Sequence, residues 1–515
     1  MAKIKCLQVG NSNWASQYEI PEHVEWSFLD NKTANVEIEK MKLAATKENP
    51  MKKYNALLLT DAQDLVEYQI LLEVMDFYTI LYDESQIEDE VLLIALKRKQ
   101  SHSISLNHPD DIITDIATYF YIGQYGLRIQ PVFVAISPNY QGTIQRKGEH
   151  EVVLASDFGK DFQYLCTWRE HNWSLADVQR KTELFLELHS TDSVEVQLEV
   201  VELNQYTGQI EKIYTFSQEE IIKGVIYGPK LASYHIHNYR LYIKGEGEVR
   251  IGSLHLRRAR GKYGSFILGG ERFVDEQCHE FISYFEPGDF RPPLCVYFGG
   301  FRSAEGFEGY FMMKNMKTPF MLFEDTGLVG GAFYRGTKTF QQEIVKRIQE
   351  KLAYLGFTNE QLVLSGMSMG THASLYYAAD LLPHGVIINK PLVNLNQVAE
   401  NQILKAPQIF PFVLDLQTYL SDHQQLSNIT VIDQEFWEHF RSADLSKTNF
   451  FIAHMLNDDY DDRIFGQLRD WLIQSQNIVM HKGIPGRHND NSEISVPMFL
   501  YYYHLLLSRD FNRKE

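Results

Sequence analysis

One short stretch of the sequence, 366–370, has the residue types and spacing of a serine nucleophile: Gly-Met-Ser-Met-Gly. The apolar segment 361–364 before it predicts a buried strand, and residues 371–379 after it predict a helix. Strand, G-x-S-x-G and helix together form the nucleophile elbow of an α/β-hydrolase, in which a sharp turn lifts the serine hydroxyl above the sheet. Glycines on both flanks let neighbouring backbone approach without side-chain clashes. The stretch predicts Ser368 as the nucleophile.

A serine nucleophile needs a base that takes its proton and a carboxylate that orients the base. In hydrolases of this fold the chain order is serine, acid, histidine. The apolar segment 449–454 predicts a strand that opens into an acidic loop, and Asp458 stands in this loop where the acid is expected. His488 follows the last predicted strand in a polar loop and is the natural base. The competing candidates are Asp459, Asp461 and Asp462 for the acid, and His372, His454 and His481 for the base.

Acyl transfer through a serine also needs two backbone N–H donors near the oxygen that becomes negative. The amide of Met369, directly after the nucleophile at the start of the predicted helix, is one candidate. The second should come from the loop after the predicted strand 294–298, where Phe-Gly-Gly-Phe resembles the H-G-G-G element of esterases. We expect the amide of Gly300 or Phe301 to supply it.

Length and composition are those of a globular protein with more than one domain. The 515 residues exceed what one core holds, and 44% hydrophobic, 13% aromatic and 23% charged residues are ordinary values. A net charge of −18 argues against a dedicated nucleic-acid binder. No apolar run is long enough for a membrane span, and the first residues lack a leader pattern. We expect a cytoplasmic protein.

The cysteines and histidines do not form a metal-binding pattern. The four cysteines lack a C-x-x-C pair, which suits a reducing compartment and argues against a zinc ribbon. His235 and His237 would share one strand face, but a third ligand is not evident, so a solvated face is the expectation. We predict no metal and no tightly bound cofactor.

The pattern of strands and helices divides the chain into three regions, of which the first two lie before residue 263. Residues 1–145 read as a small α/β domain, with short strands at 4–9, 54–59 and 78–82. Residues 146–262 read as a β-sandwich of the jelly-roll kind, because segments such as 194–200 alternate with period two.

Two details of the sandwich follow from its residues. Period-two segments at 239–243 and 248–256 flank Gly-Glu-Gly, which predicts a turn between two strands. Three aromatic residues are candidates for stacking on sugar rings, although core positions are the alternative for each of them. They are Trp168, Trp173 and Tyr234.

Residues 263–515 alternate strands and helices, which predicts a mostly parallel sheet and an α/β-hydrolase domain. Strands are expected at 319–323 and 385–389, and a long helix at 337–355. Residues 391–447 form an insertion of helices and loops, at the place where hydrolases carry a lid. The fold class is therefore α/β, with the hydrolase domain in the C-terminal half preceded by the sandwich and the small α/β domain.

Over its whole length the sequence resembles the α/β-hydrolase-like accessory secretory protein of the accessory Sec system in Gram-positive cocci. The resemblance rests on Leu-Gln-Val-Gly-Asn-Ser near the N-terminus, Val-Tyr-Phe-Gly-Gly-Phe-Arg, Ser-Gly-Met-Ser-Met-Gly-Thr-His, Met-Leu-Asn-Asp-Asp-Tyr-Asp and Gly-Arg-His-Asn-Asp. The string around the serine is its specific part. It implies Ser368 as nucleophile, Asp458 as acid and His488 as base, and the aspartate departs from relatives that carry glutamate.

The resemblance also implies an activity and partners. Members of this family are linked to O-acetylation of N-acetylglucosamine on serine-rich repeat adhesins before export. They work in the cytoplasm with companion accessory proteins and the dedicated export ATPase, which would bring this chain to the membrane periphery without a transmembrane segment. The acetyl donor does not follow from the sequence, and acetyl-CoA is a first hypothesis.

Three other functions fit the same residues. A carboxylesterase would use the same triad and pass the acyl group to water. A silent scaffold would keep the fold without a reactive serine. A glycan-binding export chaperone would depend on the sandwich more than on Ser368.

Overall fold

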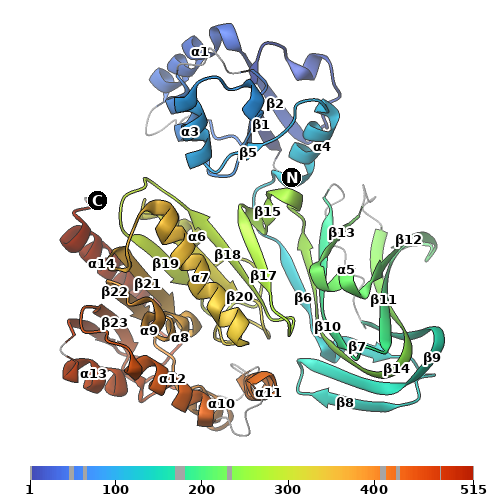
Figure 1. The fold of residues 1–515 in the computed structure, drawn as a ribbon, viewed down its shortest axis with the longest axis vertical. Helices are drawn as coiled ribbons and strands as arrows, with labels where there is room; N and C mark the ends of the chain where they lie inside the picture. Colours follow the sequence, from blue (N-terminus) through green and yellow to red (C-terminus); the bar gives the residue numbers. More distant parts are fainter. Residues whose placement is uncertain are drawn as a thin grey trace.

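The computed structural model describes residues 3–45, 52–61, 67–168, 180–228, 235–405, 413–424, 430–475 and 477–513. Three large sheets follow one another along the described part of the chain, and we call them the N-terminal sheet, the middle sheet and the hydrolase sheet. Figure 1 shows the N-terminal region at one end of the molecule, with the other two regions side by side below it. Each sheet has its own hydrophobic core.

The N-terminal sheet has five parallel strands in the order β2-β1-β3-β4-β5, with helices on both faces. Its strands are β1 Ile4–Gly10, β2 Val24–Asp30, β3 Ala56–Leu59, β4 Ile80–Tyr82 and β5 His102–Ser103. Its helices are α1 Asn31–Ala44, α2 Tyr68–Val74, α3 Glu90–Arg98 and α4 Pro109–Tyr119, with 3-10 turns at Trp14–Ser16 and Glu84–Gln86. The three strands predicted here correspond to β1, β3 and β4; β2 and β5 went unpredicted.

The middle sheet is one antiparallel sheet of nine strands that bends around its own core. Its strands are β6 Gly126–Ile129, β7 Val134–Ile136, β8 Thr143–Lys147, β9 Glu151–Trp168, β10 Thr182–Ser190, β11 Val194–Asn204, β12 Ile210–Ser217, β13 Val225–Tyr227 and β14 His235–Arg258. Helix α5 Gln218–Lys223 and a 3-10 turn at Pro131–Phe133 accompany them. In β11 the buried residues alternate along the strand, as the period-two pattern predicts.

Two predictions for this region differ from the structure. β6 pairs with β14 and β7 pairs with β9, so residues assigned to the first domain up to 145 already belong to the middle sheet. The predicted turn at Gly245–Gly247 is a bend inside one continuous strand, β14. Gly245 and Gly247 have φ of 100° and 148°, and register shifts fall between Ile243, Gly245 and Glu246. Glycines that fit a hairpin turn therefore form irregularities in a long strand instead.

The hydrolase sheet has eight strands in the order β17-β18-β20-β19-β21-β22-β23-β24. They are β17 Gly270–Val274, β18 Glu280–Glu286, β19 Leu294–Phe298, β20 Phe320–Asp325, β21 Leu362–Met367, β22 Gly385–Asn389, β23 Asn449–Met455 and β24 Val479–Ile484. The six strands from β19 to β24 pair in parallel, and β17 and β18 pair antiparallel at one edge. A two-stranded sheet, β15 Gly264–Ser265 and β16 Ile267–Leu268, and a 3-10 turn at Gly261–Tyr263 precede it.

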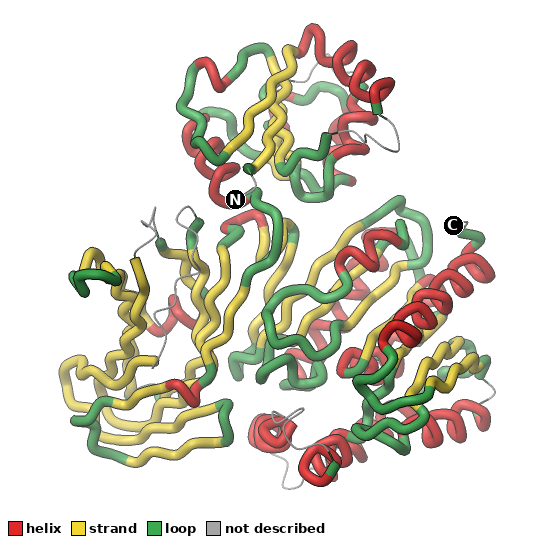
Figure 2. Tube along the Cα trace, turned by 180° about the vertical axis from the view of Figure 1, so that it is seen from behind, coloured by secondary structure: helices red, strands yellow, loops and turns green. Residues whose placement is uncertain are grey.

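Helices cover both faces of the hydrolase sheet (Figures 1 and 2). They are α6 Tyr310–Asn315, α7 Lys338–Leu355, α8 Met369–Tyr376, α9 Ala378–Leu381, α10 Leu395–Leu404, α11 Val413–Gln424, α12 Thr430–Ser442, α13 Ile464–Gln474 and α14 Ser492–Phe511, with a 3-10 turn at Asn359–Gln361. One core contains residues of α7, α8, α12 and α13, and the core on the opposite face contains residues of α6 and α14. Helices α10 to α12 occupy the predicted insertion.

Helix α7 shows why a helix forms at the predicted place. Apolar residues recur every three or four positions and face the core, among them Phe340, Ile344 and Ile348. The Thr337 side chain accepts a hydrogen bond from the Phe340 amide and caps the first turn. Gly356, with φ of 73°, ends the helix.

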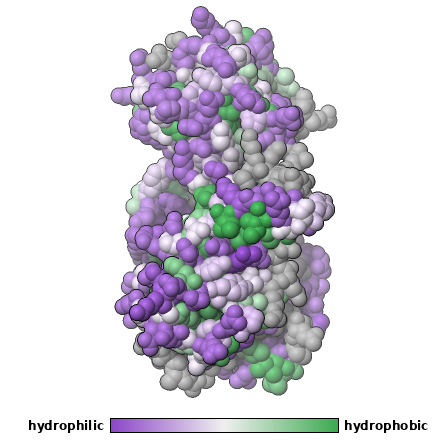
Figure 3. Space-filling model, turned by 90° about the vertical axis from the view of Figure 1, so that its right-hand side faces the viewer, coloured by the Kyte–Doolittle hydropathy of each residue, from purple (hydrophilic) through white to green (hydrophobic). Residues whose placement is uncertain are grey.

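The side of the molecule that faces the viewer in Figure 3 is mainly polar. Figure 3 shows hydrophilic residues over most of this side, with a compact hydrophobic patch near the middle and smaller ones elsewhere. Within the described ranges, we find no helix that is both long enough and apolar enough to cross a membrane.

Candidate active site

The serine of the G-x-S-x-G stretch lies in a strained turn between β21 and α8. Ser368 has φ of 50° and ψ of −117°, a conformation that non-glycine residues rarely adopt and that costs about 1–3 kcal/mol. A Cβ on Gly366 would lie 2.3 Å from the Gly370 carbonyl oxygen, and a Cβ on Gly370 would lie 2.0 Å from the Phe298 carbonyl oxygen. Both flanking positions therefore require glycine.

Ser368, His488 and Asp458 form a continuous hydrogen-bonded chain. The Ser368 hydroxyl lies 2.9 Å from Nε2 of His488, and Nδ1 of His488 lies 2.9 Å from Oδ2 of Asp458. The imidazole is 2% exposed and Asp458 is 9% exposed, whereas Ser368 is half-buried. The three side chains come from the ends of three strands, β21, β23 and β24, at the carboxyl edge of the sheet. Sequence reasoning named all three, and their part in catalysis stays a prediction.

Two neighbours of Asp458 hold the histidine in place. The Asp459 carboxylate accepts a hydrogen bond of 3.0 Å from the His488 backbone amide. The Tyr460 ring stacks on the imidazole with centroids 4.3 Å apart and an interplanar angle of 7°. Asp458 itself accepts a 2.9 Å bond from the Tyr460 amide through its other oxygen. Sequence reasoning did not find these supporting roles, although the Asp-Asp-Tyr run is visible in the sequence.

The competing aspartates have other partners. Asp461 is 1% exposed and accepts bonds from the backbone amides of Val393 and Asn394. Burial raises the pKa of Asp461 to about 6 in spite of these bonds. Asp462 lies at the surface and pairs with Lys405 at 3.2 Å. Asp458 is thus the one of the four loop aspartates whose carboxylate contacts the His488 ring.

The competing histidines lie apart from the serine hydroxyl. His372 is fully buried and packs against Phe436, and its burial holds its pKa well below the ordinary value. His454 stacks on Phe465 with centroids 3.6 Å apart, and burial lowers its pKa to about 4. His481 lies beside the same pair of rings. Of these histidines and His488, it is His488 that forms the hydrogen bond to the Ser368 hydroxyl.

The two sides of the candidate oxyanion hole differ. Met369 is the first residue of α8, so its amide has no acceptor within the helix and lies next to the nucleophile. The Gly300 amide, in contrast, donates a 2.6 Å hydrogen bond to the Glu308 carboxylate. This contact occupies one of the two amides predicted in the loop after β19. The prediction of Gly300 as a donor is thereby corrected, and the role of Phe301 stays a prediction.

A buried lysine supports the loop that carries the histidine. Lys390 follows β22, is 7% exposed and has φ of 56°. Its ammonium group donates to the Asp490 carbonyl oxygen at 3.0 Å and to the Ser492 hydroxyl at 3.3 Å. Burial lowers the pKa of Lys390, opposed by the nearby carboxylate of Asp458. Lys390 thereby ties the nucleophile's neighbouring strand to the loop of His488.

Of the three predicted sugar-stacking residues, the structure describes Trp168. Trp168 lies at the end of β9, is 2% exposed and belongs to the core of the middle sheet. Its indole faces cannot stack on a sugar there, which corrects the prediction. Trp173 and Tyr234 lie outside the described residues. His237, predicted on a solvated face, is instead 3% exposed and packs against Tyr227.

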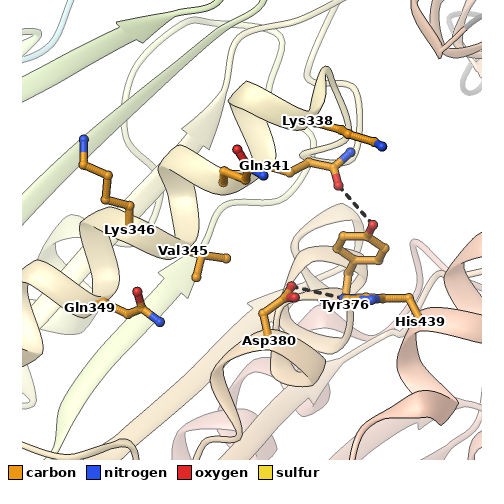
Figure 4. Close-up of a pocket in the computed structure, with 9 residues that line it drawn as sticks. Lys338, Gln341, Val345, Lys346, Gln349, Tyr376, Asp380 and His439 are labelled. Atoms are coloured by element: carbon orange, nitrogen blue, oxygen red, sulfur yellow. Dashed lines mark hydrogen bonds and ion pairs between the residues drawn. The ribbon is translucent and has the colours of Figure 1, made fainter.

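A separate polar groove of about 280 Å³ lies between α7, α8, α9 and α12 (Figure 4). The Tyr376 hydroxyl donates to the Gln341 side chain at 3.0 Å, and His439 pairs with Asp380 at 3.1 Å. No residue of the Ser368 chain lines this groove. Among the described residues, no cluster of three or more His, Cys, Asp or Glu side chains fits a metal ion.

The geometry fits acyl chemistry at the serine. His488 is placed to take the Ser368 proton as the hydroxyl attacks a carbonyl carbon, and Asp458 is placed to orient the imidazole and stabilise its charged form. The Met369 amide, at the start of α8, stays the predicted donor to the developing oxyanion. Fold and site together define the class: an α/β-hydrolase fold with a serine-histidine-aspartate arrangement at the carboxyl edge of its sheet.

The chain belongs to the accessory Sec system GspB-transporter family, whose model matches residues 4–513. It is 32% identical to an accessory Sec system protein of Streptococcus gordonii over all of this chain and 99% of that protein. It is 37% identical to an accessory Sec system protein of Staphylococcus aureus over 76% of this chain and 75% of that protein. Among solved structures it matches a chain of the Glycosylation Associate Protein complex from Streptococcus agalactiae, at 35% identity, full coverage of both chains and a TM-score of 0.92.

Proposed function

We propose that this protein is an O-acetyltransferase that forms an acetyl-Ser368 intermediate and passes the acetyl group to N-acetylglucosamine on serine-rich repeat adhesin glycans. The observation that carries the proposal is the continuous Ser368–His488–Asp458 hydrogen-bonded chain at a strained elbow. Such a chain lets a hydroxyl attack an acyl donor and form a covalent ester, which a second nucleophile then attacks.

Membership of the accessory Sec system family supports the place of this reaction in adhesin export. The Streptococcus agalactiae relative of similar fold is part of a complex named for glycosylation. We therefore propose companion accessory secretory proteins, the accessory export ATPase and the glycosylated adhesin as partners, at the cytoplasmic side of the membrane. Acetyl-CoA is the donor to test first, used as a substrate rather than held as a tightly bound cofactor.

Ester hydrolysis is the second candidate function, because the same three residues serve it and Ser368 is half-buried rather than closed off. The two functions differ in what attacks the acyl-serine: a sugar hydroxyl or water. A purely glycan-binding role has less support, since Trp168 lies in a core.

The test is the mass of adhesin glycans from cells that carry the wild-type protein or Ser368→Ala. We expect acetyl-sized increments on the glycans of wild-type cells and their loss in the variant, at equal abundance of folded protein. Lys338→Ala, on the separate groove of Figure 4, is the matched surface control and should keep the increments. Unchanged glycans in Ser368→Ala would contradict acetyl transfer through this serine.

A further inference from the structure

A cluster of charged side chains is buried where the middle sheet meets the hydrolase sheet. His255 and Arg257 lie on β14, Glu280 lies on β18, and Glu305 lies in the loop after β19. Their exposed fractions are 0%, 1%, 1% and 8%. Charged groups are rarely buried to this degree unless they are paired.

Glu305 is the member that joins this cluster to the candidate active site. Its two oxygens lie 2.5 Å from Nδ1 of His255 and 2.9 Å from Nε of Arg257, and Arg128 on β6 lies 3.6 Å away. Burial alone would raise the pKa of Glu305, but the charges of Arg257 and His255 lower it well below the ordinary value. All three cations belong to the middle sheet, so a carboxylate of the hydrolase region is held by another region.

The cations are themselves fixed by further carboxylates. The other two nitrogens of the Arg257 guanidinium bind Glu280 at 2.7 and 2.5 Å. The second ring nitrogen of His255 lies 3.0 Å from Glu187 on β10. Burial alone would lower the pKa of His255, but the carboxylates of Glu305 and Glu187 raise it. Glu305 therefore binds to groups that have little freedom to move.

The loop that carries Glu305 also carries the predicted oxyanion donor. This loop, 299–309, which we call the oxyanion loop, contains Gly300 and Phe301. Besides the Gly300 amide, the Glu308 carboxylate accepts a 3.0 Å bond from the Tyr297 hydroxyl. The Phe307 amide donates a 2.6 Å bond to the Gln124 side chain, just before β6. The loop is thus anchored at Glu305, Phe307 and Glu308.

We propose that Glu305, held by His255 and Arg257, is a positioning residue that sets the place of the oxyanion loop, so that the middle sheet contributes to acyl transfer without contacting the substrate. The inference rests on the acyl-transfer function proposed above. An oxyanion donor acts at about 2.7–3.1 Å from the oxyanion, and a misplacement of about 1 Å costs roughly 100-fold in rate. Loss of the Glu305 contacts leaves this donor without its anchor.

The test compares two carboxylates that pair with cations of the same strand. Glu305→Gln removes the negative charge by which the oxyanion loop binds His255 and Arg257. Glu151→Gln is the matched control, because Glu151 forms an equally well-formed pair with Arg250 of β14, at 2.9 and 3.0 Å, away from that loop. Two readouts are measured on the full chain: kcat and KM for p-nitrophenyl acetate, and hydrogen exchange of the amides in 299–309.

We expect Glu305→Gln to lower kcat about 10- to 100-fold with KM within about twofold, and to speed exchange in the oxyanion loop. Glu151→Gln should change neither readout there. If Glu305→Gln folds poorly, Glu305→Asp is measured as well, because it keeps the charge. It should also lower kcat at a KM within about twofold, but by a smaller factor. Equal effects of the Glu305 and Glu151 variants, or faster exchange throughout the chain, would overturn the inference. Loop exchange decides the positioning role even if the wild-type protein does not hydrolyse p-nitrophenyl acetate, whereas the proposed function is decided separately by the mass of the adhesin glycans.

Discussion

Two His–Asp pairs lie at opposite edges of the hydrolase sheet. At the carboxyl edge, His488 and Asp458 are 2.9 Å apart. At the amino edge, His384, just before β22, lies 2.7 Å from Asp510 of α14. Distance alone does not separate a pair that supports chemistry from one that supports the fold.

The surroundings of the two pairs differ in three ways. The second ring nitrogen of His488 faces a serine hydroxyl in a strained turn, whereas the His384 ring packs against Phe511 with centroids 5.0 Å apart. Asp510 is shared with the guanidinium of Arg509, while Asp458 accepts backbone amides besides the imidazole. The His384 side chain is 25% exposed, and that of His488 is 2% exposed. The nucleophile and its turn, rather than the pair, mark the candidate site.

Replacing the nucleophile should give the largest difference between the two edges. We expect Ser368→Ala to lower kcat for ester or acetyl-donor turnover by about 10⁶-fold, because the proposed acyl intermediate forms on the Ser368 hydroxyl. Stability should change by less than about 0.5 kcal/mol. Steady-state kinetics and thermal unfolding measure the two effects. Residual activity above about 1% would mean that another side chain does the chemistry.

The histidines give a matched pair of variants. His488→Gln should lower kcat by about 10⁴-fold or more, since the serine then has no base. His384→Gln should keep kcat within about twofold and lower stability by roughly 1 kcal/mol. Both variants are assayed for turnover and for unfolding in urea. If both lower kcat alike, the two edges do not differ in the way proposed.

The two acids should differ in their effect on kcat by no more than the two histidines do. Asp458→Asn should lower kcat by about 10⁴-fold, because the amide no longer stabilises the charged imidazole or fixes its tautomer. Asp510→Asn should leave kcat unchanged. The pH dependence of kcat/KM checks the reason: the loss in Asp458→Asn should persist at every pH where the variant is folded. Full activity of Asp458→Asn would transfer the role of the acid to Asp459, the other carboxylate that contacts His488.

The smallest effect is on stability at the amino edge. Burial alone would raise the pKa of Asp510, but hydrogen bonds from Arg509 and His384 lower it. Because the pKa is lower in the folded state, the added stability is present above the unfolded pKa of about 3.9 and is lost as the pH falls through the folded value. Solvent screens this pair, so we expect Asp510→Asn to lose about 0.5 kcal/mol at pH 7. Urea unfolding at pH 7 and near pH 3 should show the difference shrinking in acid.

Much of the hydrolase sheet could be predicted because its strands are short apolar runs bounded by polar turns. The strand Leu294–Phe298 lies at its predicted position. Helix α7 begins one residue after the predicted start of the helix at 337. Ser368, Asp458 and His488 could be named as candidates, and lie together in the structure, because chain order and strand ends restrict where such residues can stand. These features depend on residue types and spacing within short segments, which can be read directly from one sequence.

The remaining features depend on contacts between distant residues. The glycines at 245 and 247 fit a turn or a bulge equally well, and the pairing of β14 with four other strands decides between them. Glu308 binds the Gly300 amide from eight residues further along an irregular loop. The Trp168 ring could face solvent or core, and the bend of the middle sheet places it in the core. No periodicity in the sequence reports such contacts.

The most direct test of the account is whether Ser368 carries an acetyl group during turnover. The protein is mixed with acetyl-CoA or p-nitrophenyl acetate, quenched in acid and digested. The mass of the peptide that contains residues 366–370 is then measured by mass spectrometry. We expect one acetyl group on Ser368 in the wild-type protein and in His384→Gln, and none on this peptide in Ser368→Ala. An unmodified Ser368 in wild-type protein that turns over either donor would contradict the account.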